Sequence, residues 1–134
     1  VLCGGGTNHR IGLYDAVLIK ENHIAAAGSI PAVLERAAKL APNAKFIEIE
    51  VENLKQLAEA LNAGAKMVLL DNMSVPTLHE AVKINQSRAI LEISGGVTLN
   101  GLRELAETGV DRISIGTLTK DVKATDFSMR FGAL

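Results

Sequence analysis

The sequence is poor in aromatic residues and in cysteine. Aromatic residues make up 3% of its 134 residues, and tryptophan is absent. The core must therefore be aliphatic, which suits helices packed on parallel strands, because such strands are rich in branched aliphatic residues. Cys3 is the only cysteine, so an intramolecular disulfide is excluded and a reducing cytoplasm is the natural setting. We expect Cys3 to be a small buried or helix-end residue and not a nucleophile.

The sequence also lacks an excess of either charge and any long apolar run. Fourteen Lys and Arg residues face fifteen Asp and Glu residues, for a net charge of −1. This balance leaves no electrostatic footprint for nucleic acid or an anionic membrane. No apolar run approaches the ~20 residues that span a bilayer, and no basic-then-apolar leader begins the chain. Any anion binding must therefore depend on local placement of Lys and Arg.

Strand-like apolar runs alternate with helical patterns along the chain. The runs cover residues 16–19, 46–49, 67–70, 89–93 and 112–115, and helices are expected over 30–40, 54–63, 74–84 and 98–109. The expected N-terminal caps of the last three helices are Asn53, Ser74 and Thr98, and Gln56 would close a capping box with Asn53. Gly64 and Gly109 stand where a helix end needs a residue with positive φ. Strand, helix, strand at this spacing predicts parallel strands and right-handed crossovers.

Five strands are fewer than the eight of a closed barrel, which typically has ~250 residues. Two architectures fit: an open doubly wound sheet, or a parallel (β/α) barrel-type domain that is incomplete because its N-terminal part is absent. The chain begins at Val1, inside what resembles a helix end entering a glycine-rich turn. This start favours the incomplete barrel, with residues 1–134 as its C-terminal part.

Charged or phosphate-binding residues follow each predicted strand. They are Lys20, Glu50, Asp71, the segment 94–96 (Ser-Gly-Gly) and Gly116. In a parallel barrel all strand carboxyl ends open onto one face, which carries the active site. The pattern therefore predicts an enzyme that handles an anionic, phosphorylated substrate. Either glycine segment alone also fits a plain turn, whereas two on consecutive strands favour a phosphate site.

Two cationic segments have competing interpretations. Gly4-Gly5-Gly6 precedes His9 and Arg10, whose donors suit a carboxylate or phosphate, although a helix stop followed by a polar surface turn is equally compatible. Lys20 is either a phosphate or carboxylate ligand, a Schiff-base nucleophile, or a solvated loop lysine. Glu21 beside it argues against the lowered pKa that a Schiff-base lysine needs, so anion binding is preferred.

Acidic residues alternate with apolar ones at 47–52. In a barrel, Glu48, Glu50 and Glu52 would point inward, where an unpaired carboxylate is strongly unfavourable. They imply a cation, a sugar hydroxyl or a Lys/Arg partner. Glu50 and Asp71 on neighbouring strand ends suit Mg²⁺ or ribose hydroxyls, but no His/Cys cluster has zinc spacing. The alternative for Asp71 is an acid at a helix N-terminus.

Taken in order, several segments resemble the C-terminal part of the quinolinate phosphoribosyltransferases, also called nicotinate-nucleotide pyrophosphorylases (carboxylating). The matching segments are 4–10 (GGGTNHR), 18–24 (LIKENHI), 48–53 (EIEVEN), 69–72 (LLDN), 91–97 (LEISGGV) and 107–111 (ETGVD). The resemblance covers essentially the whole chain. It implies transfer of phosphoribose from phosphoribosyl pyrophosphate to quinolinate with decarboxylation, giving nicotinate mononucleotide, pyrophosphate and CO₂ in NAD synthesis.

The resemblance also implies roles for single residues. His9 and Arg10 would bind the quinolinate carboxylates with Lys20, which would also reach the phosphoribosyl donor. Glu50 and Asp71 would hold the ribose hydroxyls and Mg²⁺, and these two acids with Lys20 form the catalytic set. The phosphate would be cradled by Ser94, Gly95, Gly96 and Gly116.

The family's chain is about twice as long, and its active site is completed by a second subunit, so a homodimer or higher homo-oligomer is implied. Lys120 stands where many relatives have His, and we assign it no role. The alternatives are a relative acting on nicotinate or another pyridine acid, an aldolase with a Lys20 Schiff base, and a phosphate-binding barrel fragment without turnover.

Overall fold

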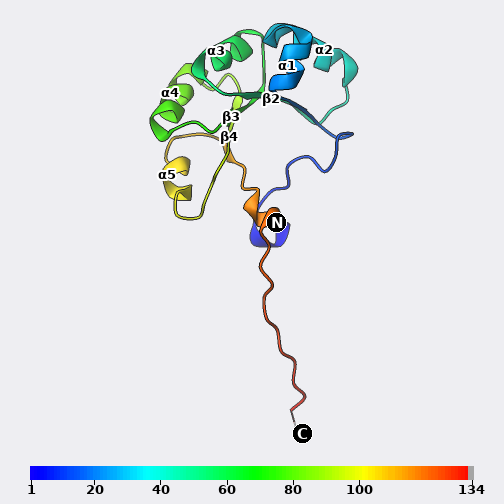
Figure 1. Ribbon diagram of the computed structural model, residues 1–134, viewed down its shortest axis with the longest axis vertical. Coiled ribbons are helices and arrows are strands. Elements are labelled where there is room, and N and C mark those ends of the chain that lie inside the picture. The colour runs from blue at the N-terminus through cyan, green and yellow to red at the C-terminus, as the bar shows by residue number, and fades with distance from the viewer. Residues whose placement is uncertain (133–134) are drawn as a thin grey trace.

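The computed structural model describes residues 1–132 and contains one parallel sheet covered by helices (Figure 1). The strands are β1 (Val17–Ile19), β2 (Ile47–Val51), β3 (Met67–Asp71), β4 (Ile90–Ser94) and β5 (Arg112–Ile113). The helices are η1 (Leu2–Gly4), α1 (Glu21–Ala27), α2 (Ile30–Leu40), α3 (Leu54–Asn62), α4 (Val75–Asn85), α5 (Leu102–Ala106) and α6 (Thr117–Lys120). None of the helices within 1–132 has the length and apolarity needed to cross a membrane.

The strand order favours the barrel-type architecture. All four strand pairings are parallel, and the order is β1-β2-β3-β4-β5 without a reversal. A doubly wound sheet reverses its strand order at a switch point and carries helices on both faces. Here α1 to α5 fan over one side of a curved sheet (Figure 1). The fold is thus a parallel α/β sheet without a switch point, which is compatible with part of a (β/α) barrel, whose closed form has eight strands.

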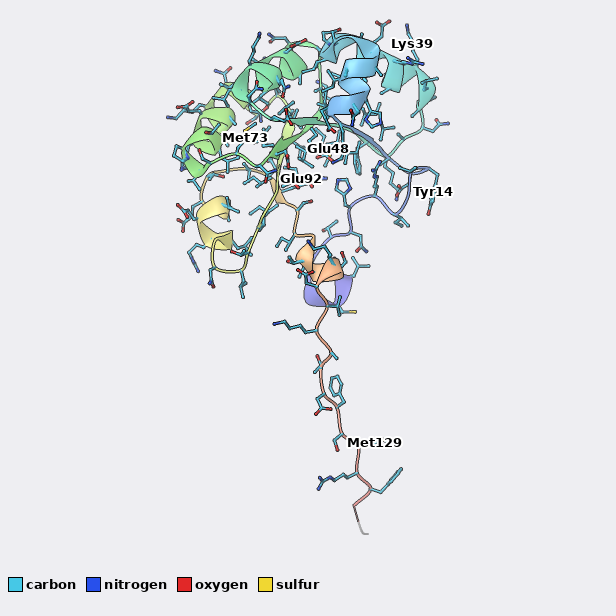
Figure 2. The ribbon with its side chains drawn as sticks, in the orientation of Figure 1. Tyr14, Lys39, Glu48, Met73, Glu92 and Met129 are labelled. Carbon is cyan, nitrogen blue, oxygen red and sulfur yellow. The ribbon has the colours of Figure 1, made fainter. Side chains whose placement is uncertain are left out.

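The alternation of side chains along each strand divides the sheet into two different faces. The face toward the helices is apolar, and its strand residues include Ile49, Val51, Val68, Leu70, Leu91 and Ile93. These pack against helix residues such as Leu57 and Leu78, which are both fully buried. The opposite, concave face carries Glu48 and Glu92 (Figure 2). By the same alternation along their strands, Glu50 and Asp71 belong to this face as well. The core therefore lies between sheet and helices, and the polar groups gather on the concave side.

Most helix ends follow the sequence-based expectation. The side chains of Asn53 and Ser74 accept hydrogen bonds from backbone N–H groups in the first turns of α3 and α4. Gln56 does not close a capping box on Asn53, because its side chain accepts from the N–H of Glu52 instead, at 2.7 Å. Gly64 has the expected positive φ of 87°, as has the glycine that ends α5.

One helix was missed and two expectations about local structure were wrong. The missed helix is α1, which follows β1. The last long helix does not start at Thr98, because α5 begins only after Gly101 and has no side-chain cap. Glu52 is exposed, since β2 ends at Val51 and the inward alternation ends with it. Cys3 is exposed in η1, next to the glycine turn that ends this helix, so of the two alternatives for Cys3 the helix-end residue is confirmed and the buried residue is not.

A turn built on Asp15 fixes the N-terminal segment against the sheet. The carboxylate of Asp15 accepts hydrogen bonds from the N–H groups of Ile11 and Gly12, at 3.1 and 3.2 Å, and pairs with Lys45 Nζ at 3.3 Å. These contacts, led by the Ile11 bond, lower the pKa of Asp15. The segment that precedes this turn lies below the concave side of the sheet (Figure 1). Its residues are thereby brought toward the acids of that face.

Candidate active site

Lys20 and Glu50 form an ion pair where β1 and β2 end. Lys20 Nζ lies 3.0 Å from Glu50 Oε2, and the Lys20 side chain is half-exposed. The hydrogen bond to Glu50 is the main cause that raises the pKa of Lys20, and the charges of Glu50, Glu21 and Asp71 add to it against a smaller opposing effect of burial. Lys20 therefore stays a cation, which suits anion binding and disfavours the neutral amine that a Schiff base requires.

Asp71, at the end of β3, is joined to the turn after β4. Asp71 lies in register with Ser94, and Asn72 Nδ2 donates to Asp71 Oδ2 at 2.8 Å. The backbone N–H of Asn72 donates to the Ser94 carbonyl at 3.0 Å. A Cβ on Gly95, whose φ is 97°, would lie 2.1 Å from Asn72 Oδ1. Only glycine fits here, so the Ser94–Gly96 turn packs directly on Asn72, the residue whose side chain donates to the carboxylate of Asp71.

Gly116 belongs to the neighbouring loop. The N–H of Ser114 donates to the Ile93 carbonyl at 2.8 Å, which continues the β4–β5 pairing past the end of β5. The loops that follow these two strands therefore leave the sheet side by side. Gly116 is exposed and precedes the four-residue helix α6, whose Lys120 is also exposed.

His9 reaches two buried acids from the N-terminal segment. Its Nε2 lies 2.9 Å from Glu48 Oε2 and 3.8 Å from Glu92 Oε1. Both carboxyl groups lie on the concave face (Figure 2), where Glu48 is 0% and Glu92 2% exposed. Burial, followed by the charge of Glu92, raises the pKa of Glu48 to about 7, although His9 and Arg112 act in the opposite direction. Ser114 Oγ donates a hydrogen bond to Glu92.

His9 also borders a cavity. It lines a space of about 410 Å³ together with Glu92, Arg112 and Ser114. Arg10, the next residue, is half-buried and forms no ion pair within the described part of the chain. A larger cavity of about 610 Å³ lies between α2 with the segment that follows it and the loop that follows α3. Its lining is mostly apolar and holds none of the strand-end residues, so we place the chemistry on the concave side.

Two groups of acids could hold a cation. His9, Glu48 and Glu92 are the one set of three ligand-type side chains within 4.8 Å of one another in residues 1–132. Glu50 and Asp71 offer hard carboxylate oxygens at neighbouring strand ends, which suits an ion such as Mg²⁺ that keeps several waters and binds one or two carboxylates. The observed ion pair of Glu50 with Lys20 already supplies one compensating charge.

The structure groups the residues proposed from sequence into three parts. Lys20, Glu50 and Asp71 share the carboxyl edge of β1 to β3, and the Ser94–Gly96 turn joins this group through Asn72. His9 lies with a different pair of acids on the same concave face, and Gly116 lies in the adjacent loop. The prediction that an inward acid needs a cation, a sugar hydroxyl or a Lys/Arg partner is confirmed for Glu50, which pairs with Lys20, whereas the partner of Glu48 is His9.

Sequence reasoning missed Glu92, Ser114 and Arg112. Glu92 interrupts the apolar run of β4, and its register partners are Leu69 and Arg112. A single acid inside a buried parallel strand was the available signal, because such strands are otherwise close to continuously apolar. Arg112 Nη1 donates to Met67 Sδ at 3.6 Å, which places it on the concave face as well.

Comparison with known proteins gives a consistent result. Residues 1–130 match the family model described as quinolinate phosphoribosyl transferase, C-terminal domain. The chain is 45% identical over 129 residues to the "Probable nicotinate-nucleotide pyrophosphorylase [carboxylating]" of Bacillus subtilis, covering 96% of this chain and 45% of that protein. The chain thus spans less than half of the length of this curated relative.

Solved structures agree with this match. The nicotinate-nucleotide pyrophosphorylase from Francisella tularensis superposes with a TM-score of 0.87 at 48% identity, over 91% of this chain and 43% of that one. NadC from Streptococcus pyogenes superposes with a TM-score of 0.90 at 39% identity, over 96% and 45% of the two chains.

Gly95→Ala is expected to destabilise the site turn more than a matched glycine substitution does. An alanine at φ 97° is strained and also collides with Asn72 Oδ1, whereas Gly28 has a φ of 88° but no atom within 4 Å of its added Cβ. Backbone strain of this kind costs ~1–3 kcal/mol, so both variants should lose stability. The collision should make the loss for Gly95→Ala larger by about 1 kcal/mol or more. Urea unfolding of both variants measures the difference, and equal losses would contradict the close packing of this turn on Asn72.

Proposed function

Because the chain belongs to the quinolinate phosphoribosyltransferase family through its C-terminal domain, we propose that it carries the transfer of phosphoribose to quinolinate with decarboxylation. The observation that supports this most is the convergence at one sheet edge. The Lys20–Glu50 pair, the Asp71 carboxylate and the Ser94–Gly96 turn meet there, beside the segment that brings in His9 and Arg10. Such a site offers cations for a dianionic acid, carboxylates for a sugar cation and backbone N–H groups for phosphate.

Quinolinate would be held by its two carboxylates. Arg10 offers a planar fork suited to bidentate carboxylate binding, and Lys20 offers a point charge. His9 contributes an imidazole whose Nε2 is already occupied by Glu48. Paired cations for two carboxylates favour a diacid over nicotinate, which has one carboxylate. The ring nitrogen of quinolinate would then be directed at the anomeric carbon of the donor.

The phosphoribosyl donor would lie across the strand ends. Glu50 and Asp71 would accept hydrogen bonds from the ribose hydroxyls and stabilise the positive charge that develops on the sugar as pyrophosphate departs. The same two carboxylates would hold Mg²⁺, which when bound neutralises pyrophosphate charge. Backbone N–H groups of Ser94, Gly95, Gly96 and Gly116 would bind the phosphate of the ribose.

The reaction is tested by turnover of the protein as encoded, including any residues that flank these 134. It should be supplied with phosphoribosyl pyrophosphate and Mg²⁺ and offered quinolinate or nicotinate in parallel. We expect nicotinate mononucleotide and CO₂ from quinolinate alone. Turnover of nicotinate but not quinolinate would keep the phosphate site and overturn the diacid assignment. Binding of the donor without any product would leave a phosphate-binding barrel.

Arg10→Ala should weaken quinolinate binding far more than donor binding. Loss of one charge-assisted contact costs ~1.5–3 kcal/mol, or roughly 10- to 100-fold in affinity. Titration calorimetry with each substrate separately measures the two effects. Arg103→Ala, which removes an exposed arginine from α5, is the matched control and should change neither affinity. Equal weakening of both substrates in Arg10→Ala would remove the proposed role of Arg10.

Asp71→Asn should raise the Mg²⁺ concentration needed for half-maximal activity. The amide keeps the shape of the side chain but removes the negative charge that attracts a divalent cation. Initial rates over a Mg²⁺ series measure this requirement. Asp126→Asn, in the exposed C-terminal segment, is the control. An unchanged Mg²⁺ dependence in Asp71→Asn would argue against Asp71 as a ligand.

The assembly and its location complete the proposal. We propose a homodimer or larger homo-oligomer whose second subunit contributes to the pocket, and light scattering on the encoded protein tests it. The cytoplasm remains our predicted location on the grounds of cysteine usage.

A further inference from the structure

The concave face contains two buried acids that the proposed reaction does not use. Glu48 is 0% exposed on β2 and Glu92 is 2% exposed on β4. The corresponding layers of a barrel interior are dominated by branched aliphatic residues. Burial of a carboxylate without a partner is strongly unfavourable, so a specific contact must compensate these two groups.

His9 provides that contact for Glu48. The distance of 2.9 Å from His9 Nε2 to Glu48 Oε2 is that of a direct hydrogen bond. The other oxygen, Glu48 Oε1, is buried and has no hydrogen-bond partner within residues 1–132. His9 is therefore the only hydrogen-bond partner of this carboxyl group in the described chain. The two side chains depend on each other. Without His9 the buried carboxyl group of Glu48 has no hydrogen-bond partner, and without Glu48 the imidazole loses the hydrogen bond that fixes its orientation.

Further contacts fix the position of this pair. The edge of the His9 ring packs against Phe46, with ring centroids 5.2 Å apart and planes at 74°. Glu92 Oε1 lies 3.8 Å from the same nitrogen, His9 Nε2. The hydroxyl of Ser114 donates a hydrogen bond to Glu92. The backbone of Ser114 is bonded to β4. The imidazole thus has one fixed edge toward the sheet, while its side chain remains 30% exposed.

An imidazole has only two ring nitrogens, and Nε2 is engaged with the acids. The nitrogen that remains for a substrate is Nδ1, which makes no hydrogen bond to any residue from 1 to 132. We propose that Glu48, together with Glu92, is a positioning residue that accepts Nε2–H of His9 and so presents Nδ1–H of the doubly protonated ring to a quinolinate carboxylate, because a bare Nδ1 could only accept a hydrogen bond. This inference rests on the proposed function for the identity of the ligand, but its geometric content is independent of turnover.

The geometric content is tested by NMR on the encoded protein labelled with ¹⁵N in histidine only. The chain has three histidines, and a His9→Asn variant assigns the His9 signals. At one fixed pH we expect a proton on His9 Nε2 that is protected from exchange, and loss of that protection in Glu48→Leu. Leucine is typical of this layer and removes the acceptor without adding a polar group. Protection of Nε2–H that survives in Glu48→Leu would overturn the proposal.

The functional content is tested by a double-mutant cycle on quinolinate KM. Glu48→Leu should raise the KM for quinolinate roughly tenfold, with little change in the KM for phosphoribosyl pyrophosphate. Glu48→Gln keeps an acceptor and should lie between the wild type and Glu48→Leu. In a His9→Asn background the Glu48→Leu change should add nothing, because Glu48 acts through His9. A full additive effect in that background would overturn the positioning role.

Two controls separate the remaining outcomes. Glu35→Leu removes an exposed acid that is paired with Lys39 on α2, and it should leave the His9 signals and both KM values unchanged. Addition of one equivalent of Zn²⁺ should leave the His9 Nε2–H signal in place; its loss would identify a metal site and overturn the proposal. If the wild type does not turn over quinolinate, the proposed function fails while the NMR experiment still decides the positioning of His9.

Discussion

The parallel register of the sheet is the constraint from which the rest of the structure follows. Because all five strands run in one direction, their carboxyl ends meet at one edge, and the side chains of alternate positions meet on one face. The apolar half of this alternation faces the helices and forms the core. The other half, from Glu48 and Glu50 to Asp71 and Glu92, lies on the concave face, so residues from distant parts of the sequence become neighbours.

The concave face needs a second element to compensate its acids, and the N-terminal segment is that element. Asp15 holds the turn of this segment through the N–H groups of Ile11 and Gly12 and through Lys45. Lys45 precedes β2, so the anchor is tied to the strand that carries Glu48 and Glu50. His9 reaches the acids from this anchored segment. Anchoring of the turn and burial of the acids therefore support each other.

The sequence alone predicted all five strands, three long helices and the gathering of polar groups at the strand ends, because these depend on local periodicity and parallel topology. It missed α1, since Lys20 begins this helix without the Ser, Thr, Asp or Asn that normally announces one. It also missed the partnership of Glu48 with His9 and Glu92. That partnership depends on which residues of the N-terminal segment cross the concave face, and no local pattern in the sequence contains this information. For the same reason no local pattern in the sequence indicated that Ser114 would donate a hydrogen bond to Glu92.

Two of the three basic side chains of the candidate site already contact acids before any ligand arrives, whereas Arg10 forms no ion pair within residues 1–132. Lys20 is paired with Glu50 and His9 with Glu48, and the whole chain carries a net charge of −1. Long-range attraction of an anion therefore has no source in the overall charge. Recognition of an anion must therefore depend on short-range geometry. Lys20 and His9 are each already oriented by an acidic partner, and a carboxylate of the ligand would be a second acceptor for the same side chain. Such a site gains affinity because the cations need little reordering on binding, which is the physical advantage of preorganisation.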